Sequence, residues 1–253
     1  MNFIYDKASE IQLASYHNQI TIFMVCVWIV FSFWGYTLKS KNNINRISLF
    51  LLSFSFLQEI LDYINRITNE HYYGGGLKLV RDLPLQLCHF AYWLSVLTLL
   101  IIVFKKYKKY QNTFFNLAYF FGFSGALMGI ITVSYEGIYT FGDILFLDLQ
   151  HSIIILNVLW LIFAYKLKFS FLGILQSFVF VNIAAICVSL VNIFIGGDAN
   201  YMFLCRAPEV DNPLLFGGVW PYYIIGFEFI FFIYGLLVLL PFKIDLLFNK
   251  KRV

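Results

Sequence analysis

The sequence is poor in charged residues. Asp, Glu, Lys and Arg make up 13% of its 253 residues, against about 25% in a typical soluble domain. Hydrophobic residues make up 60% and aromatic residues 21%, and the mean hydropathy is +0.76. This composition excludes a water-soluble domain. It also excludes intrinsic disorder, which requires low hydrophobicity and high net charge.

Cysteines and the motifs of soluble enzymes are also scarce. Four cysteines are too few for a disulfide-stapled miniprotein of this length. The sequence contains no Gly-rich phosphate loop, no G-x-S-x-G elbow and no H-E-x-x-H zinc helix. We therefore expect no cofactor and no resident metal.

Long hydrophobic runs dominate what is present. A transmembrane helix needs about 20 mostly apolar residues, far more than a strand of a membrane barrel. Seven stretches qualify, at about residues 20–38, 47–67, 84–104, 113–133, 144–165, 170–195 and 220–242. We predict an all-α polytopic membrane protein with seven transmembrane helices, in which residues 1–253 form a single integral membrane domain.

The basic residues predict an orientation. Thirteen of the 18 Lys and Arg residues fall in alternate connections and in the C-terminal tail, at residues 39–46, 105–109, 166–168 and 243–252. Cytoplasmic loops carry such an excess. We expect the N-terminus outside and the C-terminus in the cytoplasm of a plasma-membrane protein, with the first sixteen residues as a short interfacial helix. The net charge of +4 then reflects topology, and we expect membrane lipids as partners and no nucleic acid.

Several polar residues interrupt the apolar spans. Ionisable groups within a span are costly and mark functional sites by default. At about 1.5 Å per residue, five of them fall within roughly 6–12 Å of the outer ends of four spans. These five are Glu59, Asp62, Cys88, His151 and Glu228. The shared depth predicts a polar cavity that opens towards the outer leaflet or the outer surface.

Each of these residues also has a purely structural interpretation. Glu59, Asp62 and Arg66 share one helical face and can form a buried ion-pair cluster. His151 can be a core histidine bonded to a carbonyl. Cys88 can be a small buried hydrophobic residue.

Two pairings stay open at this stage. Cys88 can form a disulfide with Cys205 in the last outer loop, and Glu228 can be protonated or pair with Arg206 or Arg66. Neighbouring side chains on a helix point about 100° apart, so we expect His89 to be a poor base for Cys88 and His151 to be a better one.

The fourth span is rich in small residues. Gly122, Gly125 and Gly129 share a face, which lets helices approach closely. We interpret this pattern as a packing signal without chemistry.

Several motifs resemble those of a known family. Residues 83–88 (Leu-Pro-Leu-Gln-Leu-Cys) resemble the Leu-Pro-Leu-His-Leu-Cys signature of the YwaF-like bacterial integral membrane proteins, with Gln86 in place of the histidine. Residues 118–127 resemble that family's Gly-rich span, and His151 matches its intramembrane histidine. Residues 200–208 and 218–223 resemble its closing signature.

The bacterial family is remotely similar to eukaryotic transmembrane protein 164. That resemblance implies a phospholipid acyltransferase in which Cys88 is the nucleophile and His151 the base. On this hypothesis Asp62 or Glu59 orients the histidine, and Gln86 or Asn192 donates to the oxyanion. His89, Arg206 and Glu228 then complete the substrate site, and an acyl chain of a membrane lipid is the expected substrate.

The alternative is a transporter or binding protein for a small solute, coupled to protons through the same polar layer. A transporter should tolerate Cys88→Ser, whereas a thiol enzyme should not. A metal site made by Cys88, His151 and a carboxylate is a third hypothesis, which the sequence spacing supports little.

Overall fold

The computed structural model describes residue 4 and residues 6–71, 76–207 and 219–250, with side chains described up to residue 243. Within these residues the chain is helical, and its only β-type pairing is an isolated bridge between Lys7 and Thr140. Seven of the helical segments are long and apolar enough to cross a membrane. The prediction of an all-α fold with seven such helices is confirmed.

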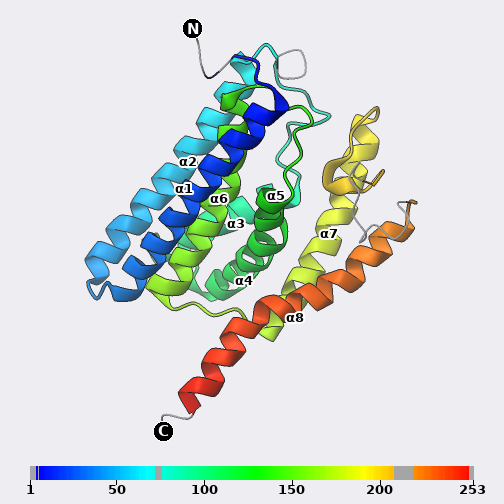
Figure 1. The fold of residues 1–253 in the computed structure, drawn as a ribbon. Helices are drawn as coiled ribbons and strands as arrows, with labels where there is room; N and C mark the ends of the chain where they lie inside the picture. The colour runs from blue at the N-terminus through cyan, green and yellow to red at the C-terminus, as the bar shows by residue number, and fades with distance from the viewer. Residues whose placement is uncertain (1–3, 5, 72–75, 208–218, 251–253) are drawn as a thin grey trace.

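The chain runs up and down between two ends of a helix bundle (Figure 1). The helices are α1 (Glu10–Thr37), α2 (Lys41–Thr68), α3 (Leu87–Phe104), α4 (Gln111–Phe121), α5 (Leu127–Ile131), α6 (Phe141–Tyr165), α7 (Phe171–Ile195) and α8 (Tyr222–Lys250). The π-helical segment η2 (Gly122–Ala126) joins α4 to α5, and the 3₁₀ turns η1 (Lys108–Tyr110) and η3 (Tyr201–Phe203) lie in connections.

Helix α1 begins earlier than the hydrophobic pattern predicts. Ser9 caps it by accepting a hydrogen bond from the backbone N–H of Gln12, whose side chain accepts one from the N–H of Ser9. This reciprocal capping box starts the helix at Glu10. Residues 10–16 therefore continue into the first span, and the expectation of a separate interfacial helix is wrong for them.

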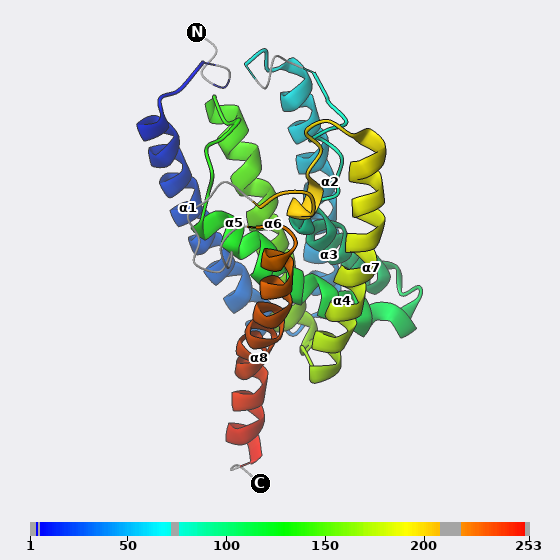
Figure 2. The ribbon, with the colours of Figure 1, turned by 90° about the vertical axis from the view of Figure 1, so that its right-hand side faces the viewer.

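Helix α6 lies at the centre of the bundle and packs against α1, α2 and α3 (Figures 1 and 2). Polar side chains bind it to its neighbours in the hydrophobic interior. Trp160 donates to Ser48 of α2 at 2.8 Å. Asn157 donates to Ser55 of α2 at 3.1 Å and to Ser95 of α3 at 3.2 Å. Such bonds help to hold helices together in a membrane, where lipid tails are as apolar as the side chains and the hydrophobic effect does not drive helix association.

Helix α3 is short, and its position determines the depth of the residues at its start. Its Tyr92 donates a hydrogen bond to the carbonyl of Ser55 on the antiparallel α2. Continuing this register places Leu87, the first residue of α3, about two turns below the end of α2 at Thr68. The residues at the start of α3 therefore lie inside the bundle, below residues 76–86.

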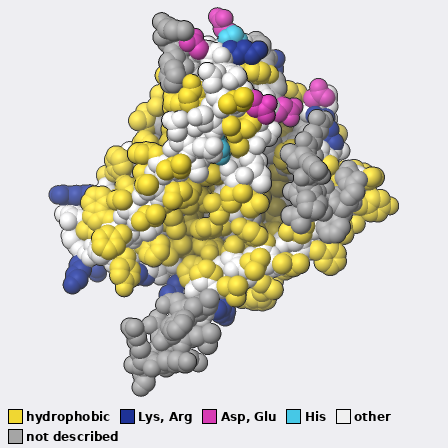
Figure 3. All heavy atoms as spheres, viewed as in Figure 1, with side chains coloured by type: hydrophobic (Ala, Val, Ile, Leu, Met, Phe, Trp, Pro, Cys, Tyr) yellow, Lys and Arg dark blue, Asp and Glu magenta, His cyan; other side chains and the backbone are white. Residues whose placement is uncertain are grey.

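Charged side chains gather at the two ends of the molecule, and an apolar band separates them (Figure 3). The end that carries the N-terminus shows acidic side chains and histidine together with some basic ones, whereas the opposite end shows Lys and Arg. Lys251 and Arg252, which the sequence assigns to the basic end, lie outside the described residues.

Asp143 ties three segments together at the N-terminal end of the bundle. Its Oδ1 accepts hydrogen bonds from Asn65 of α2 at 3.0 Å and from Asn69, the C-cap of α2, at 2.7 Å. Its Oδ2 accepts from the backbone N–H groups of Tyr139 and Thr140, at 3.1 and 3.0 Å. One carboxylate thus fixes the end of α2, the connection before α6 and the start of α6.

Replacing this carboxylate should destabilise the fold. Asp143→Ala leaves buried donors unsatisfied, and each such group costs about 1–3 kcal/mol. We expect a fall of roughly 2 kcal/mol or more in the free energy of unfolding, measured by denaturation in detergent. Glu136→Ala, an exposed carboxylate in the same connection, is the control and should leave stability unchanged. Equal stability of the two variants would contradict the anchoring role.

Candidate functional site

Cys88 and His89 are the second and third residues of α3. The sulfur of Cys88 lies 3.9 Å from Nδ1 of His89. The two side chains therefore approach each other more closely than the spacing of about 100° between neighbours on a helix predicts. The pair occupies the first turn of the helix, where no preceding turn blocks the side chains, so the imidazole can turn back towards the sulfur.

His151 of α6 has a defined hydrogen-bonding state. Its Nδ1 lies 2.8 Å from the carbonyl oxygen of Leu147. A carbonyl only accepts, so Nδ1 carries the proton and Nε2 of a neutral His151 is a free base. A methyl group added at Gly129 would stand 2.8 Å from Nε2. The base therefore faces the small gap that this glycine leaves.

The glycines of the fourth span bring the two predicted catalytic residues to one surface. Gly125 lies against the start of α3, where an added methyl group would stand 3.7 Å from the backbone nitrogen of Cys88. Gly129, four residues later, lies against His151. Residues four apart share a helix face. The glycine pattern thus has a second consequence besides close packing, because it places Cys88 and His151 along one face of η2 and α5.

The carboxylates of α2 have partners other than His151. Glu59 accepts a hydrogen bond from Gln150 at 3.2 Å. Asp62 pairs with Arg66 at 2.7 Å, and Arg66 also reaches Asp82 at 3.4 Å. The geometry thus matches the structural interpretation of Asp62 and Arg66 as an ion pair. Glu59 and Arg66 lie within electrostatic range of Cys88.

Gln86 and Arg206 lie in the connections before α3 and α8, and Asn192 lies near the end of α7. Oε1 of Gln86 accepts from the N–H of Met202 at 2.9 Å. The amide of Asn192 bonds both backbone groups of Tyr201, at 2.9 and 3.1 Å. Both polar atoms of Asn192 are therefore engaged in holding η3. Arg206 is exposed and lies 3.7 Å from Asp198.

Tyr201 locks η3 onto the segment before α3. Its hydroxyl donates to the carbonyl of Leu79 at 2.7 Å and accepts from the N–H of Leu83 at 2.9 Å. Burial raises the pKa of Tyr201 above its ordinary value, so the donating proton stays on the phenol. Residues 208–218, which carry part of the predicted closing signature, lie outside the described residues.

Glu228 lies in α8, the last of the helices long and apolar enough to cross a membrane. One of its carboxylate oxygens is buried and has no hydrogen-bond partner among the described residues. Arg66 and Arg206 pair with aspartates instead. Neither of the two arginines predicted as ion-pair partners is therefore seen to pair with Glu228 among the described residues.

The thiols are free. Cys88 and Cys205 form no disulfide, and Cys26 and Cys187 are also unpaired. Within the described part of the chain, no three His, Cys, Asp or Glu residues gather as a metal site would require.

The structure reveals a buried pair that the sequence pattern did not assign to a site. Nδ1 of His17 in α1 lies 2.9 and 3.0 Å from the two carboxylate oxygens of Asp148 in α6. Both residues are buried. The predicted first span, residues 20–38, left His17 outside it. The sequence carried one signal of its burial, because His17 and Met24 are spaced so that they share one face of a helix.

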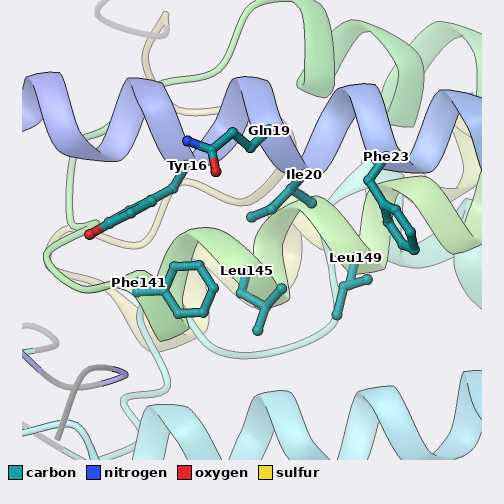
Figure 4. A pocket seen from close by; sticks show the side chains of 7 residues that line it. All are labelled: Tyr16, Gln19, Ile20, Phe23, Phe141, Leu145 and Leu149. Atoms are coloured by element: carbon teal, nitrogen blue, oxygen red, sulfur yellow. The ribbon is translucent and has the colours of Figure 1, made fainter.

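A groove of about 270 Å³ lies between α1 and α6 (Figure 4). It is mainly apolar, with polar groups from Tyr16 and Gln19 and a lining completed by Ile20, Phe23, Phe141, Leu145 and Leu149. None of these residues belongs to the surroundings of Cys88 or His151. The groove is therefore separate from the candidate site.

The family follows from comparison of the whole chain with known families. The model of the TMEM164 family matches residues 12–239, which run from the first turn of α1 into α8 and include every residue of the candidate site. A comparison with curated proteins and one with solved structures found no match. The matched range covers most of the sequence, and the chain is a multi-pass membrane protein that belongs to the TMEM164 family.

Proposed function

We propose that this chain is a lipid acyltransferase or hydrolase in which Cys88 is the nucleophile and His151 the general base. The observation that carries the proposal is the common face of η2 and α5, on which Gly125 borders Cys88 and Gly129 borders the free nitrogen of His151. A free thiol and a neutral imidazole with a fixed tautomer are the parts that thiol acyl transfer requires.

The position of Cys88 in the first turn of α3 offsets part of the cost of forming a thiolate in the interior. Its sulfur lies within hydrogen-bonding range of the backbone N–H groups of Cys88 and His89. These groups and the helix dipole favour negative charge at a helix N-terminus. The same N–H groups, with the Nε2 amide of Gln86, are candidate donors to an oxyanion.

The reaction follows from these roles. Nε2 of His151 takes the thiol proton, and the thiolate forms a bond to the acyl carbonyl carbon of a lipid ester. The ester C–O bond then breaks, and the leaving oxygen receives the proton from His151. The oxygen of an acceptor alcohol, or of water in hydrolysis, then attacks the thioester carbon while Nε2 of His151 takes its proton. The C–S bond breaks, and His151 returns the proton to the sulfur of Cys88.

Replacing the nucleophile tests the proposal most directly. Cys88→Ala should abolish labelling of the purified protein by an alkyne-tagged acyl p-nitrophenyl ester, because no thioester can form. Labelled peptides are identified by mass spectrometry. Cys187→Ala, which removes a lipid-exposed thiol, is the control and should label normally. Undiminished acylation of correctly folded Cys88→Ala protein would contradict the proposal.

His151 and His89 are distinguished by the same assay. His151→Ala should slow acylation by roughly 10²-fold or more, the usual contribution of a general base. A larger loss in His89→Ala would move the role of base to the imidazole 3.9 Å from the sulfur.

Gly129, beside the proposed base His151, should be required for rapid acylation of Cys88. In Gly129→Ala the new methyl group meets Nε2 of His151 at 2.8 Å, so the ring must shift away from its position. We expect acylation of Cys88 to fall by about tenfold or more, since small displacements of a catalytic group are costly. Gly125→Ala is the matched control, because its methyl group makes ordinary contacts at 3.7 Å or more. Equal rates in the two variants would contradict the arrangement.

The unpartnered oxygen of Glu228 favours a second candidate, transport of a small solute or of protons through the polar layer. Transport should survive Cys88→Ser and fail in Glu228→Gln. The thiol reaction should show the reverse pattern.

We also propose that the chain is a YwaF-like bacterial protein, that it lies in the plasma membrane, and that its N-terminus is outside. The resemblance of residues 83–88 supports the first point, and the Lys and Arg side chains at the far end of the bundle support the orientation (Figure 3).

Labelling of Cys205 tests the orientation. Cys205 is exposed in the connection between α7 and α8, which the proposed orientation places outside. A membrane-impermeant maleimide added to intact cells should therefore modify it. Cys205→Ser should lose this labelling. Modification that requires lysed cells would reverse the orientation.

A further inference from the structure

The buried pair of His17 and Asp148 has no part in the proposed reaction, and its cost calls for an explanation. Both residues are at least nine-tenths buried, at 7% and 2% exposure. Titratable groups within a span are expensive and usually mark a functional element. The pair connects α1 to α6, one turn before His151 on α6.

On one side, the pair leads to the surface at the N-terminal end of the bundle. A depression of about 400 Å³ lies there between the start of α1 and the connection before α6, with Glu10, Leu13 and Tyr135 in its lining. Burial and then the carboxylates of Asp148 and Glu10 raise the pKa of Tyr135. Tyr135 therefore lies within electrostatic range of both carboxylates.

On the other side, the pair leads to His151. The imidazoles of His17 and His151 lie within electrostatic range. Thr21 follows His17 by one turn on the same face of α1. Its hydroxyl is buried and has no hydrogen-bond partner among the described residues.

The register of the two helices sets the level of Thr21. His17 faces Asp148, and further along Gly35 faces Ala164. Thr21 therefore lies at the level of His151 on α6. A hydroxyl both donates and accepts protons, so Thr21 is suited to bridge the two imidazoles.

We propose that Asp148, His17 and Thr21 form a proton path between the surface depression and His151. Only proton positions change along it: His151 gives its Nε2 proton to the Thr21 hydroxyl as that hydroxyl passes its own proton to His17, and the His17–Asp148 pair releases one to water. The charged and titratable groups that face the path are Glu10 on α1, Tyr135 in the connection before α6 and His151 on α6.

The path rests on the proposed role of His151 as base and extends it. Acyl transfer to an alcohol returns the proton to the leaving oxygen and releases none. Hydrolysis produces a carboxylic acid that ionises, so one proton per turnover has to leave a site enclosed by the bundle. A proton path therefore serves the hydrolytic branch.

The chain contains only four histidines, so the path can be tested by NMR of protein labelled with ¹⁵N-histidine in detergent. The measurement is the rate at which Nε2 of His151 exchanges a proton with water, obtained from the exchange broadening of its ¹⁵Nε2 signal. His151→Gln and His17→Asn assign the two signals.

Thr21→Val should slow this exchange by about tenfold or more, because it removes the hydroxyl without changing the shape of the side chain. Thr21→Ser, which keeps the hydroxyl, should exchange like the parent protein. The His17 signal is an internal control and should keep its rate in Thr21→Val, since His17 lies between Thr21 and the surface. Asp148→Asn should slow both signals.

Unchanged exchange of His151 in Thr21→Val would overturn the path. Equal slowing in Thr21→Val and Thr21→Ser, or slowing of His17 together with His151 in Thr21→Val, would also overturn it, because either result indicates altered packing. The measurement uses no substrate. The two proposals can therefore fail separately. If Cys88 is never acylated but Thr21→Val slows proton exchange at His151, the proposed function is overturned and the proton path is supported.

Discussion

The fold depends on the need to satisfy polar groups where water is absent. An unpaired donor or acceptor costs several kcal/mol in the hydrocarbon region of a bilayer, and about 1–3 kcal/mol in a protein interior. Helix α6 meets this need for much of the bundle. Its Asp143, Gln150 and Asn157 bond to α2 at three successive levels, and its Asp148 bonds to α1. The contacts that hold the bundle together thus also position the polar residues of the site.

The short α3 gives this bundle its reactive centre. Because α3 begins about two turns below the end of α2, its first turn presents Cys88 and His89 in the interior. The residues before it are held by Tyr63, which donates to the carbonyl of Asp82, and by Tyr201. A helix N-terminus within a protein interior has free N–H groups that favour an anion. The bundle therefore offers a thiol an environment that lipid does not.

Much of this arrangement was predictable from the sequence. The seven spans follow from hydrophobic length, and the short spacing of Asp62 and Arg66 predicts their pairing. The polar residues at one depth include Cys88, Glu59 and His151. Depth alone, however, does not give direction around the helix axis. Sequence reasoning therefore left open which partner each group meets. It also missed the approach of His89 to Cys88, because a side chain in a first helical turn has rotameric freedom.

By itself the sequence determined that this chain is helical, crosses a membrane and carries ionisable groups within its spans, because these properties depend on composition and length along one chain. The tertiary structure decided that His17 bonds to Asp148, that Glu59 meets Gln150, and that two glycines of the fourth span border Cys88 and His151. These contacts join residues far apart in the sequence. They depend on how helices rotate and shift against one another, which the periodicity of a single helix does not specify.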